Sequence, residues 1–230
     1  MVDLQMAERL SLLRAKGGKK AAAYWLLRAI LRIDTYRFYG IDLADFTRDS
    51  ESDLPEGYEF LRLENPEGVA GCDPTILEDI EDQSGRSVSK IVANRGRVYA
   101  IVHGTELVSQ VNVEFRRSWV NTPLRMVLEF GEKDAFLSFG YTKPAWRGRH
   151  WIFRLRSHVC ALLSLEGWQH CVCLVQATNV KEILSLHRSR WKVVAFLFAT
   201  TGAKLLGVVH SRGARDKGLY VYAKPQQERI

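Results

Sequence analysis

A run from Cys171 to Ala177 that is apolar except at Gln176 restricts the fold more than any other segment. A short segment that is apolar on both faces is typical of a strand covered on both sides, since a surface strand alternates polar and apolar residues. The run closely follows a helical pattern over residues 152–165. A helix followed by a buried strand predicts mixed α and β structure, with helices packed on a sheet.

Further short elements stand on both sides of this pair. In chain order they are a strand (57–63), two helices (74–80, 87–93), a hairpin (98–102, 107–115) and a strand pair (125–130, 135–142) upstream, and a helix (181–188) and three strands (193–198, 205–210, 219–223) downstream. This order predicts an α+β fold with a central mixed, mostly antiparallel sheet flanked by helices.

The N-terminal part of the chain has a different composition. Residues 3–36 predict a helix, and residues 42–56 are acidic and polar. We therefore expect an N-terminal helical extension over residues 1–40, an acidic linker over 41–56 and a folded domain over 57–225. Two interpretations of residues 19–36 stay open: docking on the domain or on a second subunit in a homodimer, and peripheral contact with an anionic membrane.

At 230 residues the chain can bury a core without disulfides or a metal. Its four cysteines lack zinc-ligand spacing and follow no secretory signal, so we expect a cytoplasmic protein with reduced thiols. Cys171 and Cys173 share one face of the apolar run, which favours core packing.

The net charge of +7 is distributed unevenly. Residues 8–37 are basic, residues 42–82 are acidic, and the C-terminal half is basic again. The basic regions indicate a polyanionic partner, namely a phosphate-bearing cofactor, nucleic acid or anionic lipid. The alternative is that basic and acidic segments pack on each other.

Residues 142–151, TKPAWRGRHW, lie between a predicted strand and a predicted helix. The first N–H groups of a helix have no partner within the helix, and the helix dipole is positive there. A glycine lets the backbone approach a phosphate closely, and Arg147 and Arg149 add charge-assisted hydrogen bonds. The segment is therefore a candidate anion site, and a solvated surface turn is the alternative.

The segment resembles the turn V-x-P-x-Y-R-G-x-G-x-G/A of the GNAT superfamily of N-acyltransferases, whose backbone amides hold the pyrophosphate of coenzyme A. Thr142 stands at the Val position, Pro144 and Trp146 at Pro and Tyr, and Arg147-Gly148 at Arg-Gly.

A second similarity lies downstream of that turn. Asn179 follows the buried run as in the family's N-x-x-S motif, and Arg190-Trp191 stand where Gly-Phe is usual. The resemblance covers roughly residues 57–211 and implies a divergent GNAT-like acyltransferase fold.

The chain departs from this family at several positions. His150 and Ile152 replace small residues of the turn, which narrows the passage for a thioester donor. Glu182 stands at the serine position, and Leu186 stands where many members place a tyrosine as general acid. His187 is adjacent, but it lies about 100° around the helix and is a poor substitute.

The resemblance implies acyl transfer from acyl-CoA, with acetyl-CoA as the first expectation, to an amine of a small molecule by direct attack in a ternary complex without a metal. It also implies an oxyanion donor among the backbone N–H groups of residues 140–142. The expected cofactor-binding residues are Gly140, Tyr141, Thr142, Arg147, Gly148, Arg149, His150, Trp151 and Asn179.

The amine has to lose a proton, so a base is expected within reach. Glu114 and Glu129 are the candidates, each with a surface strand carboxylate as the alternative, and Tyr141 is the candidate acid, with a packed strand tyrosine as its alternative. His103, beside Gly104, is interpreted as a turn residue.

Three functions follow from these observations. The leading hypothesis is an acyl-CoA-dependent N-acyltransferase, and a close variant takes its donor from an acyl carrier protein. A non-catalytic GNAT-like module is the alternative from another class. A nucleic-acid partner is the weakest expectation, because no RNA-binding strand motif, helix-turn-helix or zinc finger is visible.

Overall fold

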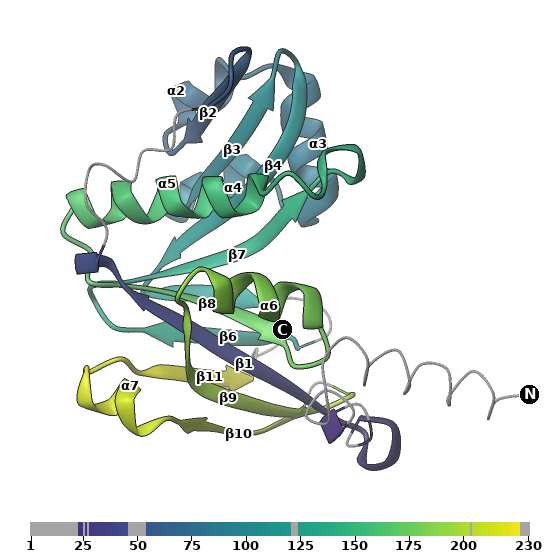
Figure 1. Ribbon diagram of the computed structural model, residues 1–230, viewed down its shortest axis with the longest axis vertical. Helices are drawn as coiled ribbons and strands as arrows, with labels where there is room; N and C mark the ends of the chain where they lie inside the picture. Colours follow the sequence, from purple (N-terminus) through teal and green to yellow (C-terminus); the bar gives the residue numbers. More distant parts are fainter. Residues whose placement is uncertain are drawn as a thin grey trace, which may run out of the picture. The chain divides into compact units, whose positions relative to one another are not determined.

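The computed structural model describes residues 23, 24, 26, 28–45, 54–120, 124–202 and 204–225. The chain divides into two compact units, each described here by itself (Figure 1). Unit 1 comprises residues 1–41, 117–131 and 173–230, and unit 2 comprises residues 42–116 and 132–172.

Unit 2 contains four antiparallel strands in the order β2-β3-β4-β7. Their bounds are Tyr58–Leu63 for β2, Arg97–His103 for β3, Glu106–Phe115 for β4 and Asp134–Thr142 for β7. The β3-β4 hairpin turns at Gly104, whose φ of +59° is a conformation that glycine adopts without strain.

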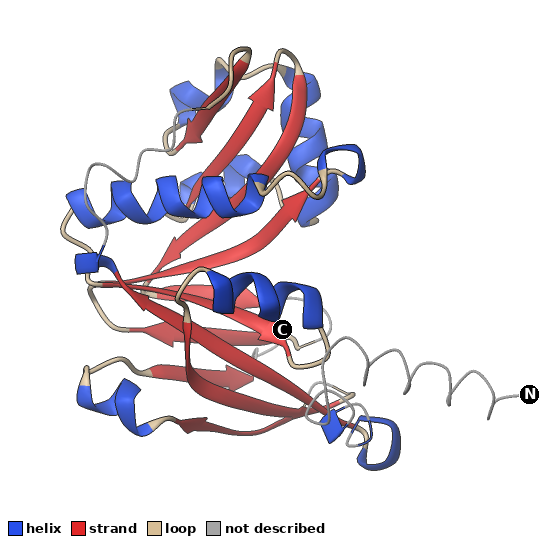
Figure 2. Cartoon of the chain, in the orientation of Figure 1, coloured by secondary structure: helices blue, strands red, loops and turns tan. Residues whose placement is uncertain are grey.

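Helices cover both faces of these strands (Figure 2). Their bounds are Pro66–Ala70 for α2, Pro74–Ser84 for α3, Val88–Ala93 for α4 and Trp151–Leu165 for α5, with short 3-10 turns η1 at Leu43–Asp45 and η3 at Pro144–Trp146. Asp73 caps α3 by accepting from the backbone N–H of Thr75, and Gly85 ends it in a left-handed conformation. One core cluster packs Ile76, Ile80 and Ile91 of α3 and α4 against alternate residues of β3.

Unit 1 contains strands in the order β10-β9-β1-β8 and a separate three-stranded sheet in the order β11-β6-β5. The bounds are Ile33–Asp42 for β1, His170–Gln176 for β8, Lys192–Thr200 for β9, Leu205–His210 for β10, Arg117–Val120 for β5, Met126–Phe130 for β6 and Val221–Pro225 for β11, with helices α6 at Val180–Arg188 and α7 at Arg212–Asp216. Strand β8 starts in the last residues of unit 2.

The structure of the N-terminal region differs from its prediction. The helix predicted over residues 3–36 is wrong for its last four residues, since β1 begins at Ile33. Arg32 has a φ of +51°, which ends the helical path, and Phe38 and Tyr39 are fully buried in the strand. An aromatic strand that is buried on both faces has no alternation to distinguish it from the end of an apolar helix. Residues 1–22 lie outside the described residues.

The expected pairing of residues 125–130 with residues 135–142 is also wrong. The first segment is β6, which pairs with β5 and β11, and the second is β7, which pairs with β4. Each segment has the apolar and aromatic composition of a strand, but composition does not specify the partner. The turn between them at residues 131–133 resembles a hairpin connection only in its length.

The other predicted elements are confirmed, with boundaries that differ by a few residues. Strand β8 is buried at Cys171, Val172 and Cys173, as the apolar run predicts, and none of the four cysteines, all of which lie in the described part of the chain, forms a disulfide. The division of the chain at residues 40 and 56 stays a prediction, and residues 46–53 of the expected linker lie outside the described residues. Within the described part of the chain, no helix is long and apolar enough to cross a membrane.

Candidate active site

Strand β7 carries a β-bulge near its C-terminal end. Ser138 faces Asn112 and Tyr141 faces Gln110, so that two residues of β7 stand opposite one residue of β4. Phe139, inside the bulge, has a φ of +52°, which is a strained conformation for a non-glycine residue. The bulge interrupts the hydrogen-bond ladder within residues 138–141, which overlap at Gly140 and Tyr141 with residues 140–142, where the sequence predicts an oxyanion donor.

The chain then makes a basic turn into α5. The N–H of Lys143 donates to the carbonyl of Val108 at 3.0 Å, which ties the strand end to β4. Gly148 and His150 have φ values of +84° and +61°. His150 is the N-cap of α5 without a side-chain cap hydrogen bond, so its side chain covers none of the first N–H groups of the helix.

The two arginines of the turn are exposed, and both stack on aromatic rings. The Arg147 guanidinium lies 5.7 Å from the ring centre of Tyr141, and its Nε donates to the carbonyl of Thr142 at 3.1 Å. The Arg149 guanidinium lies 5.3 Å from the ring of Trp146. Stacking holds each cation at the turn while its remaining N–H groups stay exposed.

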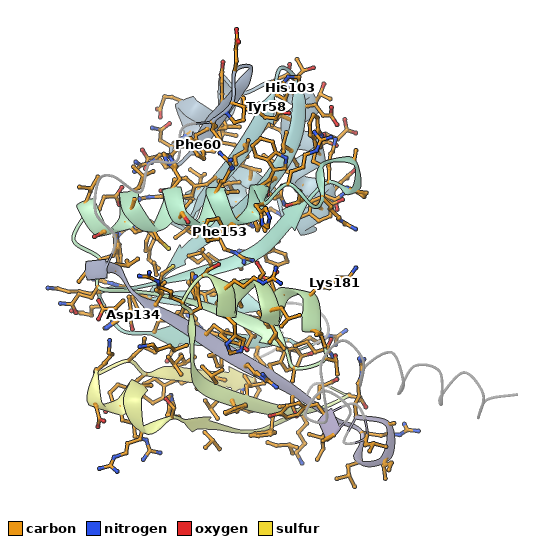
Figure 3. All side chains as sticks on the ribbon, viewed as in Figure 1. Tyr58, Phe60, His103, Asp134, Phe153 and Lys181 are labelled. Carbon is orange, nitrogen blue, oxygen red and sulfur yellow. The ribbon has the colours of Figure 1, made fainter. Side chains whose placement is uncertain are left out.

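Trp146 fixes the turn to the rest of unit 2. Its Nε1–H donates to Oε1 of Glu106 at 3.0 Å, and its ring meets Tyr58 edge-on at 5.7 Å. Tyr58 also stacks on Trp151, with 4.5 Å between the ring centres. The ring of His103 lies 4.6 Å from that of Tyr58 in a tilted arrangement, and both residues are labelled in Figure 3. The aromatic group therefore connects both ends of the turn to the start of β2 and to the β3-β4 hairpin.

Arg156 of α5 lies beside the bulge. It is 8% exposed, and a Cβ added to Gly140 would lie 2.9 Å from its Nη2. A glycine at residue 140 thus lets a buried guanidinium approach the backbone of β7. Arg156 is not among the residues predicted from the sequence, although one arginine within the mostly apolar inner face of helix 152–165 is a signal that could have identified it.

The two candidate bases lie in different units. Glu114 on β4 of unit 2 is 6% exposed, receives a hydrogen bond from Ser138 at 3.3 Å and pairs with Arg86 at 2.8 Å. Glu129 on β6 of unit 1 is 35% exposed in its side chain and pairs with Lys224 at 2.7 Å. Of the two glutamates, Glu114 therefore belongs to the strands that form the bulge. Because its side chain is buried, Glu114 is not a surface strand carboxylate, which was its alternative interpretation.

The residues of the second motif belong to unit 1. Asn179 caps α6, because its Oδ1 accepts from the N–H of Glu182 at 3.3 Å. Leu186 is fully buried. His187 Nε2 lies 3.4 Å from the hydroxyl of Tyr39, whose pKa is raised because the ring is buried, and a hydrogen bond from Arg37 partly offsets this shift.

The remaining predicted residues, from Gly140 to Thr142 and from Arg147 to Trp151, follow one another along a single strand, turn and helix. Tyr58 and Glu106, which hold Trp146 of the turn in place, were not predicted from the sequence. Their contacts with Trp146 join segments that are far apart in the chain. Among the described residues, no group of three or more His, Cys, Asp or Glu side chains is placed to hold a metal ion.

Comparisons with known proteins identify the fold. A GCN5-related N-acetyltransferase from Sphaerobacter thermophilus superposes with a TM-score of 0.50 over 91% of this chain, at 13% sequence identity. The chain has the GNAT fold. The predicted fold class is thereby confirmed, and the bulged strand β7, the basic turn and α5 are parts of a GNAT fold. No family model matches the sequence, and a comparison with curated proteins gives no match.

Two further structures are similar at lower scores. A GNAT-family protein from Novosphingobium aromaticivorans has a TM-score of 0.48 and 16% identity over 79% of this chain. A functionally unknown conserved protein from Staphylococcus epidermidis has a TM-score of 0.47 and 9% identity over 76% of this chain. The chain spans 57% of the length of the Sphaerobacter protein, 66% of the Novosphingobium protein and 65% of the Staphylococcus protein.

Proposed function

We propose that the protein transfers an acyl group from acyl-CoA to an amine of a small molecule. The observation that carries this proposal is the bulge of β7 followed by a basic turn and a helix start without a side-chain cap, within a GNAT fold. The bulge supplies a backbone N–H outside the ladder, and the turn supplies helix N–H groups and two stacked arginines. Together these groups fit a thioester carbonyl and a pyrophosphate.

In the proposed reaction the amine nitrogen attacks the thioester carbonyl. A C–N bond forms, the C–S bond breaks, and the thiolate leaves with its electron pair. The β7 backbone stabilises the negative charge on the carbonyl oxygen, and Arg147 and Arg149 bind the phosphates. Acetyl-CoA is the first donor to test, and acyl length stays part of the proposal.

Proton transfer is assigned to residues of unit 2. Glu114 is the favoured base, because it lies on β4 and receives a hydrogen bond from Ser138 of the bulge. Tyr141, half-buried at the end of β7, is the favoured acid, because its ring lies against Arg147 of the turn that is proposed to bind the phosphates. Leu186 stands where many GNAT members place a tyrosine as general acid, and its aliphatic side chain has no proton to donate.

A second function is a non-catalytic GNAT-fold module. The buried Leu186 and the bulky His150 at the cap of α5 favour it, because neither side chain assists a thioester donor. The carrier-protein variant of the first function is supported by the excess of basic residues in unit 1.

Calorimetric titration with acetyl-CoA and with a long-chain acyl-CoA tests the proposal. We expect Arg147→Ala to weaken binding about tenfold to a hundredfold, since hydrogen bonds to charged groups contribute about 1.5–3 kcal/mol. Lys90→Ala, on the exposed side of α4, is the matched control and should leave binding unchanged. Absence of binding to both thioesters would contradict the proposal and leave the module or the carrier-protein donor.

A further inference from the structure

The two units differ strongly in charge. Unit 1 contains 20 Lys and Arg against 7 Asp and Glu, whereas unit 2 contains 13 Lys and Arg against 19 Asp and Glu. Unit 1 therefore has a net charge of +13, which is larger than the net charge of +7 of the whole chain. A field of one sign attracts partners of the opposite sign and raises their association rate.

The cations of the two units also differ in their partners. In unit 2, Arg62, Arg86, Arg97 and Lys143 all form ion pairs with carboxylates of the same unit. In unit 1, Arg28 and Lys224 pair with Asp34 and Glu129. Most of the remaining cations of the described part of unit 1 thus face solvent without a carboxylate to neutralise them.

One group of these cations lies on and just after α6. Lys181, Arg188, Arg190 and Lys192 are exposed, and no ion pair or hydrogen bond of their side chains occurs among the described residues. Lys181 and Arg188 are seven residues apart, so they share one face of the helix, and Figure 3 shows Lys181 pointing away from it. Leu184 lies on the same face between them and is 47% exposed. These five residues are called the α6 face.

We propose that the α6 face docks a small acidic protein that places an apolar side chain against Leu184. Lys181 and Arg188 flank Leu184 on one helix face, and an apolar residue bordered by charged residues is the usual arrangement of a protein interface. Charge complementarity selects the acidic partner, because the face contains four cations, whereas Glu182 is the one carboxylate of α6.

The structure favours a protein over the other polyanions. Phosphate groups of a nucleic acid need no apolar contact, and Trp191, which could stack on a base, is 3% exposed. A membrane-bound helix needs a row of apolar residues to insert, but Ile183 and Leu186 of α6 are buried. Leu184 alone is left, which suits a single contact on a protein.

A peptide-binding assay with the full-length protein tests this proposal without any thioester, so its result is independent of acyl transfer. The probe is a short helical peptide of glutamate and leucine, read by fluorescence anisotropy. The reference peptide has every leucine replaced by glutamine. An oligo-dT strand and phosphatidylserine vesicles are titrated in parallel.

We expect the variant with Lys181→Glu and Arg188→Glu to bind the leucine peptide about tenfold more weakly, which corresponds to about 1.4 kcal/mol. Leu184→Gln should remove the preference for the leucine peptide over the glutamine peptide. The matched control changes Lys204→Glu and Arg212→Glu, which are exposed residues of unit 1 outside the face, and should bind nearly as the wild type.

Three results would overturn the proposal. The control substitutions at Lys204 and Arg212 could weaken peptide binding as much as those at Lys181 and Arg188, which would show that net charge alone is responsible. The wild-type protein could bind both peptides equally. Finally, oligo-dT or vesicles could bind more tightly than the peptide and lose binding in the α6 variant, which would assign the face to nucleic acid or to a membrane.

Discussion

Units 1 and 2 use their charged residues in different ways. In unit 2, four cations (Arg62, Arg86, Arg97 and Lys143) are paired with carboxylates of the same unit. Arg62 and Arg97 share the carboxylate of Glu166, and although partial burial opposes its ionisation, the hydrogen bond from Arg97 lowers its pKa. In unit 1 the cations of the α6 face have no carboxylate partner among the described residues. Paired charges hold a strained strand and turn in place, whereas unpaired charges are available to a partner.

The largest expected effect comes from breaking a buried ion pair of unit 2. Arg86→Met leaves Glu114 buried without its cation, and we expect a loss of about 3–5 kcal/mol in the free energy of unfolding. Urea denaturation measures this loss. Adding Glu114→Leu should restore most of it, because the double variant no longer buries an unpaired charge. A loss below about 1 kcal/mol in the single variant would show that the pair is solvated.

A pH-dependent effect is expected in unit 1. Burial, with a contribution from Asp34, raises the pKa of Tyr36 from 10.0 to about 12, so its hydroxyl ionises earlier in the unfolded chain than in the folded protein. The unfolded state then binds fewer protons, and Tyr36 lowers the free energy of unfolding progressively between about pH 10 and pH 12.

This contribution amounts to roughly 2–3 kcal/mol at the upper end of the window. The measurement is the difference in stability between the wild type and Tyr36→Phe as a function of pH. The difference should be constant below pH 10 and should change in favour of the phenylalanine variant above it. A stability difference that does not vary with pH would show that Tyr36 has the same pKa in the folded and the unfolded protein.

A smaller effect is expected at the aromatic support of the basic turn. Trp146→Phe keeps the ring but removes the N–H that donates to Glu106. We expect acyl-CoA binding to weaken by about threefold to tenfold, since a hydrogen bond contributes about 1 kcal/mol. Calorimetry should show the same loss for Glu106→Leu and little loss for Glu106→Gln, which still accepts the bond. Equal losses for all three variants would rule out this positioning role.

The smallest effect is expected at an exposed ion pair of unit 1. Lys224 is 63% exposed in its side chain, and its bond to Glu129 joins β11 to β6 at the surface. Lys224→Ala should change the free energy of unfolding by less than about 1 kcal/mol, because solvent and salt screen such a pair. A loss comparable to that of Arg86→Met would remove the contrast between the units.

Local signals in the sequence predicted much of the fold. The apolar run of β8, the glycine turn of the β3-β4 hairpin and the caps of α3 each depend on residues that are close in the chain. These local signals missed β1, because an aromatic segment buried on both faces resembles the end of an apolar helix. They also predicted the wrong neighbour for β6, since the composition of a strand does not specify its partner.

The candidate site divides in the same way. The sequence by itself determined a strand, a basic glycine-containing turn and a helix in direct succession, because an anion site at a helix start needs only neighbouring residues. Tertiary structure alone decided the bulge at Phe139, the approach of Arg156 to Gly140 and the support of Trp146 by Glu106. It also distributed Glu114 and Glu129 between two units. These features join segments that are distant in the chain, so only packing can specify them.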